Sequence, residues 1–108
     1  MPIENIPDLL AAYRRNFVPE RADGINGTVQ LHLTGADAGD HTLHFKDQTF
    51  DITDGAIEDP TVEVTADSAD WIELSLGKVN PMVLMMKGRL KLRGSIPLAT
   101  KFQSLFRS

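Results

Sequence analysis

Apolar and polar residues alternate in four short stretches of this chain, and this alternation constrains the fold more than any other feature. The stretches are residues 29–33, 42–45, 49–53 and 61–65. Because successive side chains of a strand point to opposite faces, the pattern predicts four strands with one apolar and one polar face. Turn-forming residues at 36–40, 47–48 and 54–55 favour antiparallel hairpins, at least among the first three strands.

Before the first of these stretches, apolar residues recur at the spacing of a helix. The apolar residues that recur at helical intervals are Ile6, Leu9, Leu10, Tyr13 and Phe17. Pro7 and Asp8 suit the first turn of a helix, and Pro19 is expected to end it. The sequence therefore predicts a first helix with one apolar stripe.

Two short helices are predicted after the fourth strand. Asp67 or Ser68 is expected to cap the first of them, which ends at Gly77. Its apolar residues are Trp71, Ile72, Leu74 and Leu76. The second runs over residues 81–86, because Pro81 suits its first turn.

A fifth strand and a last helix complete the predicted elements. Leu90 and Leu92 indicate the strand, and Pro97 is expected to start the helix. The apolar stripe of this helix is Leu98, Phe102, Leu105 and Phe106. The fold class is therefore α+β, in which helices from both ends of the chain cover the apolar face of the sheet.

Length and composition exclude several kinds of protein. A chain of 108 residues has room for one domain, 1–108, with one core. Cysteine is absent, which excludes a disulfide scaffold, thiolate zinc ligands and thiol catalysis. No secretory signal opens the sequence, and its longest apolar run, 82–86, is too short to span a bilayer. We therefore expect a cytoplasmic domain.

The net charge of −4 is divided unevenly along the chain. Residues 1–73 carry all 15 acidic side chains and four basic ones, whereas residues 74–108 carry seven basic side chains and no acidic one. An acidic body with one basic end argues against nucleic-acid binding. It fits a transient contact with an anionic membrane surface or a ligand head group, and it equally fits a solvated basic face.

Signatures of catalysis and metal binding are missing. His32 and His44 fall on the polar faces of neighbouring predicted strands and could approach one another, with Asp51 or Glu63 as a third ligand. Two histidines without motif spacing favour exposed sheet residues instead. No nucleophile elbow and no phosphate-binding loop occur, and the acidic residues are scattered. We therefore expect no metal, no cofactor and no catalytic residue.

Three methionines cluster on one predicted helix. Met82, Met85 and Met86 have i, i+3, i+4 spacing and should point the same way. Thioether side chains fill cores, and they also line pockets that accept flexible apolar ligands. Trp71, the single tryptophan, lies on the neighbouring predicted helix and either packs in the core or walls the same pocket.

Several linked motifs support a family resemblance over the last forty or so residues. They are Asp70-Trp71, Gly77-Lys78-x-Asn80-Pro81, Gly88-Arg89-Leu90-Lys91-Leu92-x-Gly94 and Leu98-Ala99-x-Lys101. With these motifs the chain resembles the sterol carrier protein-2 family. The resemblance implies a five-stranded, mainly antiparallel sheet with helices packed on one face. It also implies an apolar tunnel between sheet and helices that takes sterols, fatty acids or acyl-CoA.

The resemblance further implies the residues of a binding site. Carried over by position, the tunnel lining would be Trp71, Leu74, Met82, Met85, Met86, Phe102, Leu105 and Phe106. The basic residues that are candidates to meet a carboxylate or phosphate head group are Lys78, Lys87, Arg89 and Lys101.

These observations favour a non-catalytic protein that binds or transfers an apolar lipid. The expected ligand is a fatty acid, an acyl-CoA, or a sterol-like or isoprenoid lipid. One alternative is a protein-interaction or dimerisation module, accessory to a lipid- or quinone-metabolising enzyme, whose apolar cluster is an interface. The other is an enzyme that uses some of the scattered carboxylates.

Overall fold

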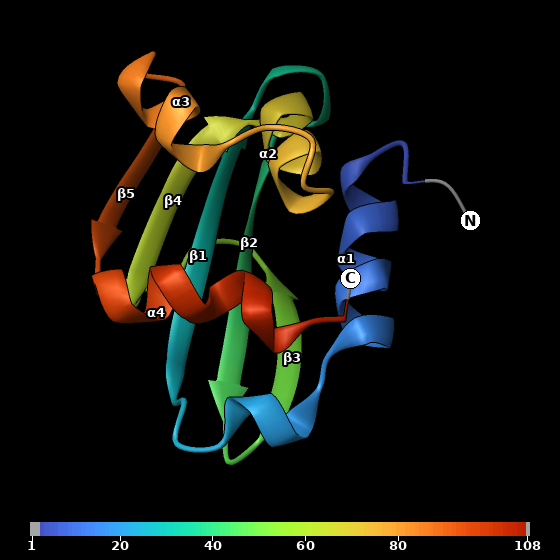
Figure 1. Ribbon diagram of the computed structural model, residues 1–108, viewed down its shortest axis with the longest axis vertical. Helices are drawn as coiled ribbons and strands as arrows, with labels where there is room; N and C mark the ends of the chain where they lie inside the picture. Colours follow the sequence, from blue (N-terminus) through green and yellow to red (C-terminus); the bar gives the residue numbers. More distant parts are fainter. Residues whose placement is uncertain (1–2, 108) are drawn as a thin grey trace.

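A five-stranded sheet forms one layer of the molecule, and helices pack against one of its faces (Figure 1). The computed structural model describes residues 3–107. The strands are β1 (Gly27–Thr34), β2 (Gly39–Lys46), β3 (Thr49–Asp54), β4 (Val62–Asp67) and β5 (Leu90–Gly94). They follow the order β3-β2-β1-β4-β5, in which only the β1–β4 pair is parallel. The predicted α+β class and mainly antiparallel sheet are confirmed.

Short connections join the first three strands. A 3-10 turn, Gly35–Asp37, links β1 to β2, and Asp47 and Gln48 link β2 to β3. Both residues of the second turn have positive φ, 50° and 61°, which is the backbone of a type I′ hairpin. The two antiparallel hairpins predicted from the turn residues are confirmed.

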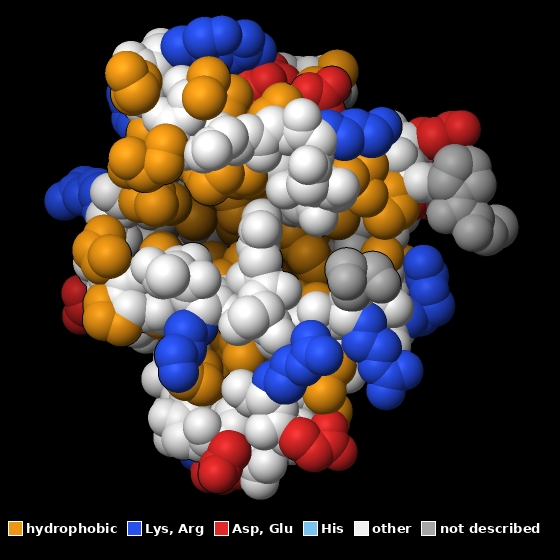
Figure 2. All heavy atoms as spheres, in the orientation of Figure 1, with side chains coloured by type: hydrophobic (Ala, Val, Ile, Leu, Met, Phe, Trp, Pro, Cys, Tyr) orange, Lys and Arg blue, Asp and Glu red, His pale blue; other side chains and the backbone are white. Residues whose placement is uncertain are grey.

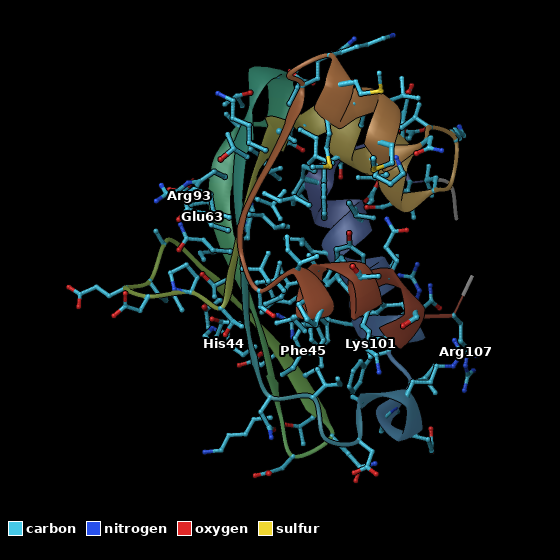
Figure 3. The ribbon with its side chains drawn as sticks, turned by 60° about the vertical axis from the view of Figure 1, so that its left-hand side comes forward. His44, Phe45, Glu63, Arg93, Lys101 and Arg107 are labelled. Atoms are coloured by element: carbon cyan, nitrogen blue, oxygen red, sulfur yellow. The ribbon has the colours of Figure 1, made fainter. Side chains whose placement is uncertain are left out.

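The connection from β3 to β4 crosses the face of the sheet that carries no helix (Figure 3). Two buried polar side chains hold it there. The Thr42 hydroxyl donates to the carbonyl of Gly55 at 2.8 Å, and the Gln30 side-chain oxygen accepts from the N–H of Ile57 at 3.2 Å. This crossover brings β4 beside β1 in parallel.

The first helix, α1, spans Ile6–Asn16 and begins as its sequence predicts. The Asn5 side chain caps it by accepting from the N–H of Asp8 at 2.8 Å. Its end differs from the prediction, because the helix stops before Pro19. Phe17 is extended and forms a β-bridge with Phe106, so a contact with the far end of the chain ends the helix early.

Three further helices follow β4. They are α2 (Ser68–Ser75), α3 (Pro81–Met86) and α4 (Ile96–Lys101), the last continued by a 3-10 turn at Phe102–Leu105. Asp67, Asn80 and Ser95 cap them through side-chain oxygens that accept backbone N–H groups. The predicted capping by Asp67 is confirmed, and α4 begins one residue before Pro97. None of the helices within residues 3–107 has the length and hydropathy to cross a membrane.

Aromatic rings fill the core where α1 and the end of α4 meet β2. Phe45 points from β2 toward the helices (Figure 3). The ring centroid of Phe102 lies 5.6 Å from that of Tyr13, 6.0 Å from that of Trp71 and 5.4 Å from that of Phe106. This cluster anchors one end of the helical layer on the sheet.

Gly94 closes β5 where the chain passes very near to another strand. Its φ is +104°, and a Cβ there would overlap the carbonyl oxygen of Thr61. That carbonyl accepts the N–H of Ser95 at 2.8 Å. A glycine is therefore required for α4 to start directly against the end of the sheet.

Candidate functional site

A cavity of about 370 Å³ lies between the sheet and the short helices, and we call it the apolar cavity. Its floor is formed by β1, β4 and β5, and its walls by α2, α3 and α4. The lining residues are Val29, Val62, Val64, Trp71, Leu74, Pro81, Met82, Met85, Leu90, Leu92, Ile96, Ala99, Thr100, Phe102 and Gln103. All but Thr100 and Gln103 are apolar. Figure 2 shows this hollow, coloured as hydrophobic, between the upper helices and α4.

The side chains explain the shape of this cavity. Val62 and Val64 are short and face the helices from β4, and Ala99 is the small residue that α4 presents to the space. Met82 and Met85 stand at the rim, with exposed fractions of 61% and 41%. A stiff β-branched floor under flexible thioethers gives a fixed base and an adaptable opening. Its volume is typical of a small-molecule site.

A second cavity of about 420 Å³ lies between α1 and the end of α2, and we call it the α1 cavity. Its lining residues are Ile3, Leu9, Ala12, Tyr13, Asn16, Ser75, Leu76, Gly77, Gln103, Phe106 and Arg107. It contains more polar groups than the apolar cavity. Within residues 3–107, Gln103 alone lines both cavities.

The structure brings together five of the eight residues that the resemblance implied for a tunnel lining. Those that line the apolar cavity are Trp71, Leu74, Met82, Met85 and Phe102. Phe106 lines the α1 cavity instead, and Leu105 is fully buried in the core. Met86 is 85% exposed on α3 and lines neither cavity.

The four head-group candidates lie outside the apolar cavity. Lys78, Lys87 and Lys101 are exposed on the surface. Arg89 forms a bidentate pair with Asp70, with Nε to Oδ2 at 2.9 Å and Nη2 to Oδ1 at 2.8 Å. Asp70 is buried, so Arg89 neutralises a carboxylate of the α2 helix.

Sequence reasoning missed the floor of the cavity. Val29, Val62 and Val64 were placed on the apolar face of the sheet, yet nothing in the alternation indicates which part of that face the helices leave uncovered. Gln103 was missed because a single glutamine beside an apolar stripe carries no spacing signal. Its role depends on the carbonyl of Leu74, to which its amide donates at 3.3 Å.

A polar group lies at the buried end of the α2 wall. The hydroxyls of Tyr13 and Ser75 are 2.8 Å apart. Burial raises the pKa of Tyr13 above its ordinary value, and the hydrogen bond with Ser75 and the nearby indole of Trp71 oppose this shift only in part. The indole Nε1 of Trp71 lies near this hydroxyl, but within residues 3–107 it makes no hydrogen bond of normal geometry.

The histidines do not form a site together. In the register of β1 and β2, His44 is opposite Thr28 and His32 is opposite Asp40, so the expectation that they could approach one another is wrong. His32 Nδ1 lies 2.6 Å from Asp40, and its Nε2 lies 3.5 Å from Glu63. His44 and Glu63 lie on the face away from the helices (Figure 3). Within residues 3–107, no three His, Asp or Glu side chains lie so that they could ligate a metal together.

Comparison with known proteins identifies the family that this chain matches. A model of the SCP-2 sterol transfer family matches residues 8–107. Hydroxysteroid dehydrogenase-like protein 2 of Xenopus laevis is 27% identical over 101 residues, which are 93% of this chain and 24% of that protein. The chain thus spans about a quarter of this curated relative.

Two solved structures share the fold. One is the sec-alkylsulfatase Pisa1 from Pseudomonas sp., with a TM-score of 0.79 and 20% identity over 94% of this chain and 16% of that one. The other is palmitated SCP2L2 from Aedes aegypti, with a TM-score of 0.66 and 18% identity over 97% of this chain and 96% of that one.

An apolar cavity between a sheet and its covering helices is the architecture of a protein that encloses an apolar molecule. The chain belongs to the SCP-2 sterol transfer family, whose members bind or transfer apolar lipids in general.

Proposed function

We propose that this chain is a non-catalytic carrier that holds a fatty acid, an acyl-CoA, or a sterol-like or isoprenoid lipid in the apolar cavity. The single observation that carries the proposal is the lining of that cavity, which is apolar except for two residues. The palmitated relative of the same fold supports an acyl chain as the ligand. Residues 1–108 would act as one lipid-binding domain.

Burial of the chain supplies enough free energy for such binding. Each methylene moved out of water contributes ~0.8 kcal/mol, so a dozen methylenes contribute roughly 10 kcal/mol before costs. Association and ordering of the ligand remove several kcal/mol of this. Micromolar affinity therefore follows without any specific polar contact. For an acyl-CoA, whose head is too large to enter, Lys78 and Lys87 flank α3 and are our candidates to meet its phosphates.

Native mass spectrometry of the protein purified from its own host tests this function. We expect a bound species of lipid mass at one per chain, and organic extraction then identifies it. Delipidated protein should rebind palmitate, which the fluorescence of Trp71 reports, since this residue lines the cavity and is the single tryptophan. A protein that is empty as purified and that also ignores palmitate would contradict the proposal.

An apolar surface surrounds the rim of the cavity. The exposed large hydrophobic side chains of residues 3–107 all lie between positions 76 and 96. They are Leu76, Met82, Val83, Met85, Met86 and Ile96, and we call them the α3 surface. Figure 2 shows hydrophobic side chains gathered over α3, with basic side chains beside them. We propose that this surface touches an anionic membrane transiently while lipid is loaded or released.

Met86→Asp should weaken binding to vesicles that contain phosphatidylserine by about tenfold, because it removes an apolar contact and adds a repelled charge. Co-sedimentation measures this binding, and vesicles of phosphatidylcholine alone should bind the unaltered protein less. Ala56→Asp, which adds the same charge in the exposed β3–β4 connection, is the matched control and should bind normally. Equal binding by both variants would contradict the contact.

The α3 surface also favours a second candidate function, that of an interaction module. There these side chains would dock a second copy or a partner protein. Sedimentation at micromolar concentration separates the two: a monomer that binds vesicles supports the carrier, and a dimer that ignores vesicles supports the module.

A further inference from the structure

One side chain lines both cavities. Gln103 lines both of them and reaches from the 3-10 turn after α4 to the backbone of α2, where its amide donates to the carbonyl of Leu74. We call this side chain the bridge between the two cavities. On the two sides of this bridge lie about 370 Å³ in the apolar cavity and about 420 Å³ in the α1 cavity.

This bridge is easily opened. Its hydrogen bond to Leu74 is 3.3 Å long and joins two uncharged groups, which places it at the weak end of such bonds. Gln103 is exposed rather than packed, and water or a ligand oxygen can satisfy its amide when it turns away. Rotation of this one side chain therefore frees the space that it occupies between the cavities without moving the backbone.

The two cavities differ in the chemistry they offer a ligand. A carboxylate left in the apolar cavity would find no charged side chain among the residues that line it. The Tyr13, Asn16 and Ser75 residues bring hydroxyl and amide groups to the α1 cavity, and Arg107, whose side chain is exposed, stands at its edge; within residues 3–107 no acidic residue lines it. Within residues 3–107, Arg107 is the one basic residue that lines either cavity.

We propose that the two cavities are one binding site, in which a free fatty acid lays its chain in the apolar cavity and its carboxylate past Gln103, beside Arg107. Gln103 and Arg107 then select a single-chain lipid with a small anionic head. This inference rests on the proposed function, because it assigns the head-group end of the same ligand. It assigns the head-group contact to Arg107, and not to the four basic residues that the resemblance implied, which are Lys78, Lys87, Arg89 and Lys101.

Titration of delipidated protein with palmitate and with hexadecanol tests the head-group contact, since the two share a chain length and differ in charge. Arg107→Gln should lower the affinity for palmitate by about tenfold, as expected for loss of one charged hydrogen bond. The affinity for hexadecanol should change by no more than about twofold. Lys101→Gln, an exposed cation on α4 that lines neither cavity, is the matched control and should change neither ligand.

A second variant tests the passage between the cavities. Gln103→Phe replaces a side chain that can turn into water with an apolar ring that stays in place. This variant should have about tenfold lower affinity for palmitate and unchanged thermal stability. Unchanged palmitate affinity in both Gln103→Phe and Arg107→Gln would overturn the inference while the carrier function stands. A loss in Lys101→Gln instead would place the carboxylate outside the α1 cavity. Failure of the unaltered protein to bind either lipid would overturn the carrier function as well.

Discussion

Met85→Asp is expected to abolish retention of palmitate at micromolar concentration while the protein stays folded. Met85 lines the apolar cavity at its rim and is partly exposed, so an aspartate there reaches water in the empty protein. Once an acyl chain fills the cavity, the same carboxylate loses water without gaining a partner. That costs about 2 kcal/mol or more, which corresponds to about thirtyfold in Kd. Titration followed by Trp71 fluorescence measures the loss.

Met86→Asp is the matched control for this prediction. It adds the same charge to the next residue of α3, which lines neither cavity, and it should bind palmitate as the unaltered protein does. Ala99→Trp provides a second variant without added charge, because it fills the cavity from α4. Normal palmitate binding by both Met85→Asp and Ala99→Trp would exclude the apolar cavity as the ligand site.

Phe102→Ala should lower the free energy of unfolding by about 3–5 kcal/mol, the usual cost of removing a buried phenylalanine. Only 3% of Phe102 is exposed, and its ring contacts those of Tyr13, Phe45, Trp71 and Phe106. Urea denaturation measures the change. Delipidated protein has to be used, because a ligand bound to the folded state would add its own stabilisation.

Ile96→Ala is the control for the stability measurement. Ile96 also lines the apolar cavity but is largely exposed, so its truncation should change the free energy of unfolding by no more than about 0.5 kcal/mol. A loss below about 1 kcal/mol for Phe102→Ala would show that the aromatic cluster does not hold the helical layer in place.

The fold could be predicted from the sequence because its local signals agree. Pro81 and the glycine at 88 bracket α3, and the predicted apolar residues of β1 to β4 face the helices, although Gln30 and Thr42 on the opposite face are also buried. The errors arise where distant segments meet. The end of α1 depends on the bridge between Phe17 and Phe106, which no local pattern indicates. The separation of His32 from His44 depends on strand register, which a sequence pattern does not fix to the residue.

The site could be predicted only in part, for the same reason. Helical spacing and the family resemblance indicated the wall that holds Trp71, Leu74 and Met85. The prediction that the three methionines point the same way is wrong for Met86. Met85 faces the cavity, whereas Met86 faces solvent. Arg89 was predicted to meet a head group, but it forms an ion pair with Asp70. Asp70 is 19 positions away in the sequence, so no local pattern indicates this pair. The position of Gln103 in both linings depends on how α2 and the turn after α4 pack together, which no local pattern indicates.

The parallel pairing of β1 with β4 has a consequence for how the chain assembles. Val29 pairs with Val62, with the whole β2–β3 meander between them, so this contact closes a long loop that the two hairpins do not require. Loop closure makes such pairing slow compared with hairpin formation. The meander is therefore expected to form first, and β4, β5 and the helices above them afterwards. During that interval the valines that later form the floor of the apolar cavity are uncovered, so the protein is most exposed to aggregation before β4 and the helices are in place.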